Sequence, residues 1–94
     1  VSAGAGSAPA YVAMMIEGLA DGMVLHGLNR ELAYQVAEKM VQGTATTLLE
    51  TKQLPAELKD GVASPGGSTI RGVASLEEDG LRSAMIKAIT KTIN

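Results

Sequence analysis

The sequence predicts an all-α protein, a helical bundle of about five helices that is completed by a second copy of the chain. No segment alternates apolar and polar residues with a period of two, so strands are not supported. Apolar residues instead recur at steps of three and four, as they do along one face of a helix. Of the 94 residues, 46% are hydrophobic but only 2% are aromatic. The core must therefore be aliphatic, and its small side chains suit close helix packing.

Charge and composition exclude several classes of partner. The net charge of −2 provides no basic surface for a polyanion, and two tyrosines without Phe or Trp provide no platform for stacked bases, so no nucleic acid is expected. The lack of cysteine excludes disulfides and thiolate chemistry and fits a cytoplasmic protein. No signal peptide is visible and the chain opens on Val1 instead of Met, so we expect a piece of a longer protein.

The first helix is expected from about Pro9 to His26. Residues 1–8 are small and flexible, and proline is favourable at the first helical position. The helix is apolar on nearly all faces, so we expect it to be buried on most sides. Gly18 and Gly22 each cost roughly 1 kcal/mol relative to alanine inside a helix, which predicts that a neighbouring helix approaches the backbone closely there.

Two carboxylates in this helix bear on membrane and metal binding. Glu17 and Asp21 interrupt the apolar run from Ala8 to Leu25, so we interpret it as a buried helix of a soluble protein with no membrane partner. They share one face, but His26 lies more than one turn beyond Asp21 and completes no ligand set. Solvated or inter-subunit carboxylates are favoured over a metal site, and His26 suits the helix C-terminus by its charge.

A second helix is predicted over Arg30–Thr51, with Gly27 ending the first helix and Asn29 as the N-cap. Its apolar pairs repeat every four residues. Because a helix turns about 100° per residue, such a stripe drifts around the helix and cannot be covered by one neighbour. This predicts a homo-oligomer. The pairs are Leu32/Ala33, Val36/Ala37, Met40/Val41, Thr44/Ala45 and Leu48/Leu49.

Three shorter helices follow. One begins at Pro55 and reaches about Val62. Ser68 or Thr69 is expected to cap the next, which extends to about residue 79 before a stop or hinge at Gly80. The apolar stripe of the last helix consists of Leu81, Ala84, Met85, Ala88, Ile89 and Thr92.

The candidate site is the stretch "SPGGST", residues 64–69. Its two glycines permit φ values that other residues avoid, and they deliver consecutive N–H groups to a helix start, where partial positive charge accumulates. This chemistry suits a carboxylate or a phosphate. A turn that merely carries an N-cap explains the same residues, so the pattern alone leaves both readings open.

A second glycine-containing stretch does not predict a nucleotide site. "GAGSAP", Gly4 to Pro9, has the glycine spacing of a dinucleotide fingerprint. That fingerprint requires a preceding strand in a βαβ unit, and only residues 1–3 precede it here. A flexible lead-in to the helix is the favoured interpretation.

Several segments together resemble the C-terminal domain of pyrroline-5-carboxylate reductase. "GSAPAYV" resembles the family's G-S-G-P-A-Y segment, "IEGLADGMVLHGLNRELA" its first helix pair, and "LEEDGLRSAMIKAI" its closing helices. The most specific part is "LKDGVASPGGSTI", within the signature "LLETKQLPAELKDGVASPGGSTI". The resemblance covers essentially the whole chain.

The resemblance implies both a fold and an activity. Residues 1–94 would be a C-terminal dimerisation and substrate-binding domain, similar to the C-terminal domain of 6-phosphogluconate dehydrogenase. It would form a homodimer by interleaving helices, and some members of the family assemble further into rings of dimers. The implied reaction is reduction of 1-pyrroline-5-carboxylate to L-proline, with NADPH or NADH bound mainly by an N-terminal domain absent from this chain.

The resemblance also implies the site residues. The N–H groups of Ser68 and Thr69 would hold the substrate carboxylate, and the Thr69 hydroxyl would be the catalytic hydrogen-bond partner of the ring nitrogen. Two positions depart from the family: Ala8 replaces a usual glycine, and Gly61 replaces a side chain that contacts substrate or cofactor in many relatives. These departures favour the alternative, a structural oligomerisation module without a ligand. The implied substrate-binding residues are Gly61, Ser64, Gly66, Gly67, Ser68 and Thr69.

Overall fold

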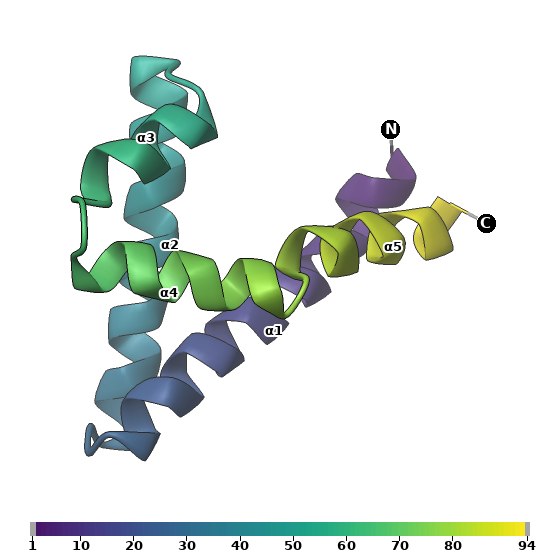
Figure 1. Ribbon diagram of the computed structural model, residues 1–94. Coiled ribbons are helices and arrows are strands. Elements are labelled where there is room, and N and C mark those ends of the chain that lie inside the picture. Colours follow the sequence, from purple (N-terminus) through teal and green to yellow (C-terminus); the bar gives the residue numbers. More distant parts are fainter. Residues whose placement is uncertain (1, 94) are drawn as a thin grey trace. The chain divides into compact units, whose positions relative to one another are not determined.

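The computed structural model describes residues 2–93, and in that range it contains five helices and no strand (Figure 1). The all-α prediction is confirmed. The chain divides between Thr51 and Lys52 into two compact units, which are described separately below. The first unit holds α1 and α2, and the second holds α3, α4 and α5. The helices span Ser2–Leu25 (α1), Arg30–Thr51 (α2), Pro55–Val62 (α3), Ser68–Glu78 (α4) and Leu81–Ile93 (α5).

The start of α1 differs from the prediction. The helix begins at Ser2, and Pro9 lies inside it instead of at its first position. The fixed φ of proline is itself helical, so the ring is compatible with the helix although it removes one backbone hydrogen bond, at a cost of about 3 kcal/mol. The residues before Pro9 are small and fit a helix without steric conflict, and the two glycines among them lower the helix propensity without ending the helix. Residues 2–8 are therefore helical, and Val1 lies outside the described residues.

Gly27 ends α1 as predicted. Its φ is +109°, in the region that favours glycine. The Gly27 N–H donates to the Val24 carbonyl and the Leu28 N–H donates to the Met23 carbonyl, each at 3.0 Å. These two bonds form the motif that often closes helices at a glycine. The connection to α2 is therefore short and fully hydrogen-bonded at this end.

Asn29 caps α2 as predicted, because its Oδ1 accepts a hydrogen bond from the Leu32 N–H at 2.8 Å. We expect Asn29→Ala to lower the free energy of unfolding of the 94-residue chain by about 1 kcal/mol, since that N–H loses its partner. Urea unfolding followed by circular dichroism at fixed protein concentration measures this. Asn29→Ser keeps a capping oxygen and should match the parent chain. An equal loss in both variants would show that the cap does not stabilise the helix.

The core of the first unit is built from alanines. Ala20 of α1 and Ala33 and Ala37 of α2 are fully buried. Side chains this small allow the two helices to approach closely, so the prediction of close packing is confirmed. The predicted neighbour at Gly18 and Gly22 is not supplied by the described residues of this chain, because a Cβ at either glycine would meet nothing within 4 Å, so a close approach there stays a prediction. Partly buried apolar residues surround the alanines: Ile16, Met23, Val24, Leu28 and Tyr34.

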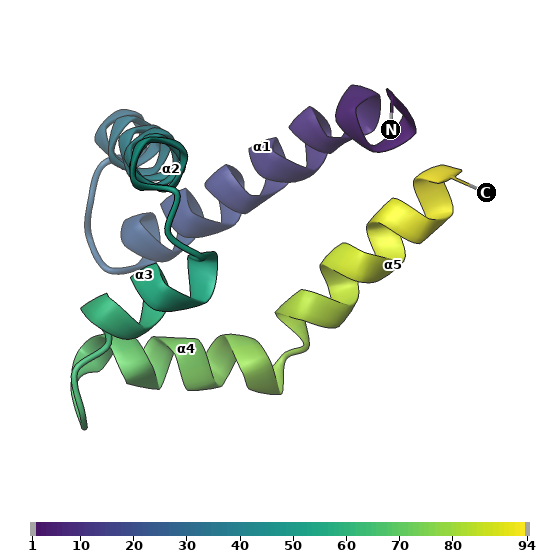
Figure 2. The same ribbon diagram turned by 90° about the horizontal axis from the view of Figure 1, so that it is seen from above.

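Most of α1 is exposed in the single chain, so the predicted burial on most sides is not provided by this chain alone and stays a prediction for the homo-oligomer. Met14 is 67% exposed and Leu25 80% exposed. Figure 2, which looks along α2, shows α1 extending sideways from it, so one neighbouring helix covers only a short part of α1. By length and composition, Gly6–Leu25 is also long and apolar enough to cross a membrane, a test that core helices of soluble proteins pass as well.

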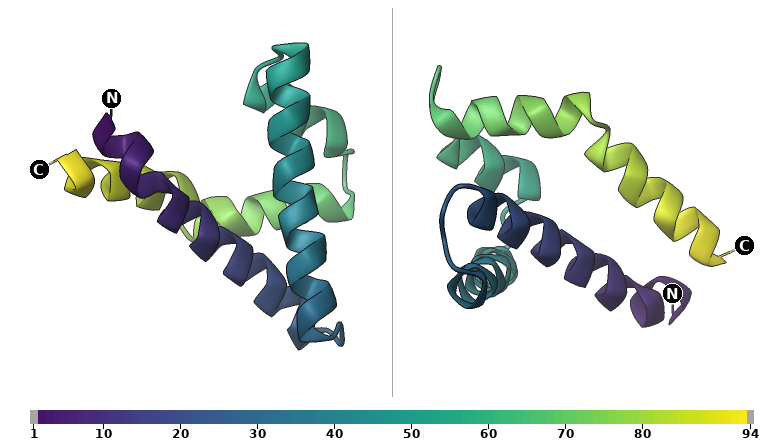
Figure 3. Two further views of the ribbon diagram at one scale, coloured as in Figure 1. Left: turned by 180° about the vertical axis from the view of Figure 1, so that it is seen from behind. Right: turned by 90° about the horizontal axis from the view of Figure 1, so that it is seen from below.

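Local hydrogen bonds and a glycine set the helix boundaries of the second unit. At the start of α3 the Leu54 N–H donates to Oε1 of Glu57 at 2.7 Å, so the acidic residue of the first turn supplies the cap. Gly80, with φ +76°, separates α4 from α5 as predicted. Arg82 donates from Nε to both carboxylate oxygens of Glu77 at 3.1 Å, across this junction. Figure 3 shows α4 and α5 meeting at a bend.

Candidate functional site

The stretch that precedes α4 forms a tight turn. The Gly67 N–H donates to the Ser64 carbonyl at 3.1 Å, with Pro65 and Gly66 between them. Proline at the second position and a glycine of positive φ at the third, here Gly66 at +70°, are typical of a type II turn. The predicted need for backbone freedom is thus confirmed at Gly66.

Gly67 is favoured for a different reason. Its φ is −81° with ψ 179°, an extended conformation open to any residue. A Cβ at this position, however, would lie 2.6 Å from Oγ of Ser64 and 3.3 Å from its carbonyl oxygen. The two adjacent glycines therefore serve two separate purposes, one conformational and one steric.

The N-cap of α4 is Gly67, so the prediction that Ser68 or Thr69 caps this helix is wrong. Both residues are already helical and lie in the first turn. An N-cap residue needs extended backbone, which the turn supplies at Gly67, one or two residues earlier than expected. No side chain caps the helix, because glycine has no oxygen to offer.

This start leaves main-chain donors available for an anion. The first N–H groups of a helix have no partner within it, and those of Ser68 and Thr69 belong to exposed residues. No acidic residue occupies the first turn of α4. The helix end is thus electropositive and suits a carboxylate or a phosphate.

Arg71 was not singled out from the sequence. Its guanidinium donates from Nη1 to the Gly66 carbonyl at 2.9 Å, which places a positive charge beside the turn. The sequence feature that could have identified it is a basic residue one helical turn after the glycine pair. The bond also ties the first turn of α4 to the loop, so it adds rigidity as well as charge.

The other predicted residues lie along the same segment. Ser64 opens the turn, and Gly61 lies one turn before it, in the last turn of α3. Gly61 is exposed, and a Cβ there would meet nothing within 4 Å. Five of the six predicted residues are therefore consecutive or nearly so in one turn and helix start, whereas Gly61 belongs to the preceding helix.

Asp21, one of the two carboxylates of α1, joins the two helices of the first unit. Asp21 accepts a hydrogen bond from Nη1 of Arg30 at 2.5 Å, which joins α1 to the first residue of α2. This hydrogen bond raises the pKa of Arg30. The Arg30 guanidinium also lies 5.5 Å from the centre of the Tyr34 ring. Among the described residues, no group of three His, Asp or Glu side chains is placed to hold a metal ion.

The structure is thus an all-α domain in which a glycine turn presents the amides of a helix start. The family model for pyrroline-5-carboxylate reductase dimerisation matches residues 1–94, and the chain belongs to that family. The resemblance noted in the sequence is confirmed.

Individual relatives agree with this assignment. The pyrroline-5-carboxylate reductase of Synechocystis sp. is 58% identical over 84 residues, which cover 89% of this chain and 32% of the relative. That of Escherichia coli is 54% identical over 86 residues, covering 92% and 32%. The crystal structure of Plasmodium falciparum pyrroline carboxylate reductase with NADP bound matches with a TM-score of 0.92 at 34% identity, over 97% of this chain and 35% of that one. The chain spans about a third of the length of these relatives.

Proposed function

We propose that this chain is the C-terminal, dimerising and substrate-binding part of a pyrroline-5-carboxylate reductase. The observation that carries the proposal is the family match over all 94 residues. The whole enzyme reduces 1-pyrroline-5-carboxylate to L-proline in the cytoplasm as a homodimer, with no nucleic acid or membrane partner. NADPH or NADH binds mainly to an N-terminal domain outside this chain. The threefold greater length of the relatives and the NADP in the Plasmodium protein support that division.

The turn before α4 is the proposed carboxylate site. The N–H groups of Ser68 and Thr69 hold the substrate carboxylate, and the electropositive helix end favours its charge. The hydroxyl of Thr69 is the hydrogen-bond partner of the ring nitrogen. When bound, the reduced nicotinamide supplies the hydride. A small ring held at two points keeps one face toward that donor, which favours the reaction by orientation.

The remaining proposed contacts come from main chain and from Ser64. Gly66 and Gly67 keep the backbone next to the substrate free of side chains. Gly61 has no side chain and is exposed, so any contact it makes uses its backbone. This same observation favours the second candidate, a structural helical module in which the turn has lost its ligand.

Assays of the full-length protein and of the 94-residue chain test the proposal. With pyrroline-5-carboxylate and NADPH or NADH, we expect turnover by the full-length protein and none by the chain alone, because the hydride donor has no site on it. Loss of nicotinamide absorbance measures the rate. Full activity of the chain alone would contradict the division of roles. A folded, dimeric but inactive full-length protein that does not bind proline would favour the structural module.

A further inference from the structure

A single arginine places a positive charge at the start of α4. Arg71 lies one helical turn beyond the N-cap Gly67, and the side chains of a helix point back toward its N-terminus. Its Nη1 therefore reaches the Gly66 carbonyl, to which it donates at 2.9 Å. Among the described residues, no other charged side chain forms a hydrogen bond or an ion pair with residues 64–67. The guanidinium thus lies beside the turn, although Arg71 itself belongs to the helix.

This position is unfavourable for a cation in the free chain. The amides at a helix start carry partial positive charge, so acidic side chains are favoured there and basic ones are not. The first turns of α2 and α3 contain Glu31 and Glu57, whereas that of α4 contains no acidic residue. Within the described part of the chain Arg71 forms no ion pair, in contrast to Arg30 and Arg82. Helix stability therefore does not explain this arginine, but an anion bound at the amides does.

The hydrogen bond to Gly66 fixes the charge in place. The Gly66 carbonyl and the Gly67 N–H belong to one planar peptide, and that N–H donates to the Ser64 carbonyl at 3.1 Å. Since this peptide is held at both ends, the guanidinium is tied to a rigid turn. Arginine has five N–H donors, so one bond to a carbonyl leaves others for a ligand. A carboxylate at the amides of Ser68 and Thr69 therefore shares the helix start with a fixed positive charge.

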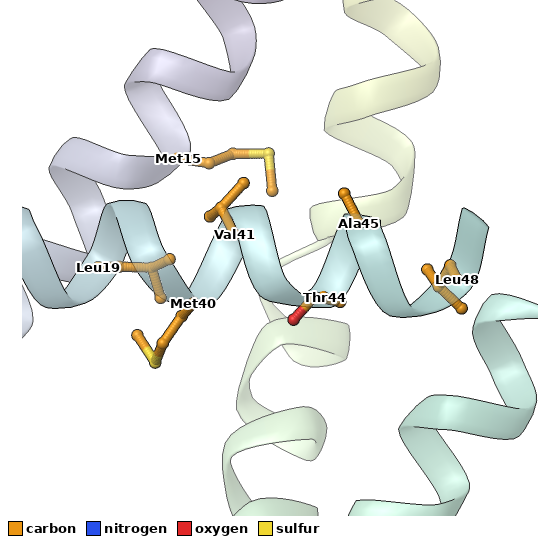
Figure 4. Close-up of a pocket in the computed structure, with 7 residues that line it drawn as sticks. All are labelled: Met15, Leu19, Met40, Val41, Thr44, Ala45 and Leu48. Atoms are coloured by element: carbon orange, nitrogen blue, oxygen red, sulfur yellow. The ribbon is translucent and has the colours of Figure 1, made fainter. Parts of the chain in front are cut away.

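The groove between the two helices of the first unit lacks such a charge. Its volume is about 430 Å³, and Figure 4 shows its lining residues: Met15, Leu19, Met40, Val41, Thr44, Ala45 and Leu48. None of them is charged, and the Thr44 hydroxyl is the one polar side-chain group among them. A carboxylate that loses its hydration needs a positive charge or hydrogen-bond donors in return. The turn before α4 provides both, whereas this groove does not.

We infer that Arg71 gives this site its preference for an anionic substrate. The inference rests on the proposed function of the turn as the carboxylate site of the reductase. The guanidinium attracts the substrate carboxylate to the amides of Ser68 and Thr69, so Arg71 acts on substrate binding and not on hydride transfer. A residue that binds substrate and transition state equally well changes KM and leaves kcat unchanged.

Three substitutions in the full-length reductase test this inference. Arg71→Gln removes the charge but keeps an N–H donor for the Gly66 carbonyl, and it should raise KM for pyrroline-5-carboxylate about fivefold, the upper end for an exposed charge pair. Arg71→Lys keeps the charge and should recover most of this loss. Lys91→Gln, the control, removes a positive charge from an exposed position near the end of α5 and should leave KM at the parent value. In every variant kcat should stay within about twofold of the parent.

Ionic strength and an uncharged ligand separate the effect of charge from that of shape. Salt screens an exposed charge, so the difference in KM between the parent and Arg71→Gln should nearly vanish at about 0.5 M KCl. L-proline should inhibit Arg71→Gln about fivefold more weakly than the parent. L-prolinamide has the same ring but no carboxylate, and its inhibition constant should not change. A turn that had merely lost its shape would weaken both ligands and would stay weakened in salt.

The outcomes distinguish this inference from the proposed function. If the full-length protein does not reduce pyrroline-5-carboxylate, the proposed function fails and the inference fails with it. If the protein is active but Arg71→Gln has the parent KM, the reductase stands and the inference is overturned. An equal rise in KM for Arg71→Gln and Arg71→Lys also overturns it, because the charge is then not what matters. Thermal unfolding should show all variants within a few degrees of the parent, since Arg71 and Lys91 are exposed.

Discussion

Thr69→Ala in the full-length reductase is expected to lower kcat/KM for pyrroline-5-carboxylate by about 100-fold, within the range for loss of a group that assists proton transfer. The substitution removes the hydroxyl that the ring nitrogen would contact but keeps the N–H that would hold the carboxylate. A 100-fold change corresponds to about 2.7 kcal/mol of transition-state stabilisation. Steady-state kinetics with saturating NADPH measure it.

Two further variants make this result interpretable. Thr69→Ser keeps a hydroxyl and should recover most of the lost activity. Ser75→Ala removes a hydroxyl from an exposed position farther along α4, outside the proposed site, and should leave both kcat and KM at the parent values. Thermal unfolding of all three variants should be the same within a few degrees, because both positions are exposed. Unchanged kinetics for Thr69→Ala would remove this residue from the mechanism.

Ala37→Leu is expected to lower the free energy of unfolding by about 3 kcal/mol, at the upper end for overpacking a tight contact. Ala37 is fully buried beside α1, and three added carbon atoms would force α1 and α2 apart. Urea unfolding at fixed protein concentration measures the change, which matters because dimer stability depends on concentration. Ala56→Leu, at an exposed position of α3, serves as the matched control. Equal midpoints for the two variants would show that the alanine contact does not hold the hairpin together.

Local signals predicted the element boundaries well where a hydrogen bond enforces them. Gly27 ends α1 and Asn29 starts α2 because each makes or permits a particular backbone hydrogen bond, visible from residue type alone. The predicted start of α1 at Pro9 was wrong. Proline is common at the first position of a helix, but its fixed φ is equally compatible with a position inside a helix. The capping residue of α4 was placed one or two residues too late, because the turn gives Gly67 the extended conformation.

Contacts between helices were harder to predict than the helices themselves. Small residues indicated that two helices approach closely, but the sequence did not show that Ala20, Ala33 and Ala37 would make the contact within the chain. That choice depends on where the two helices cross, which is a property of both together. The burial of α1 likewise depends on its neighbours, because a single chain has too few helices to cover all of its apolar faces.

The sequence predicted the chemistry of the candidate site, but it did not predict whether the site binds a ligand. The pattern of paired glycines before a helix start correctly indicated a turn that presents amides. A purely structural turn has the same geometry, so the local pattern could not choose between the two. The family match bears on that choice because it concerns the whole chain, while the roles of Ser68 and Thr69 stay predictions that kinetics can test.

The alanine contact between α1 and α2 joins helices that are adjacent in sequence, across a connection of four residues. Contacts of such short separation form within microseconds to milliseconds. Covering the exposed apolar side chains of α1, such as Met14 and Leu25, by another copy requires two chains to meet and so proceeds at a rate set by their concentration. A newly made hairpin thus keeps these apolar side chains uncovered until it meets a second chain, and during that interval it is open to non-specific association.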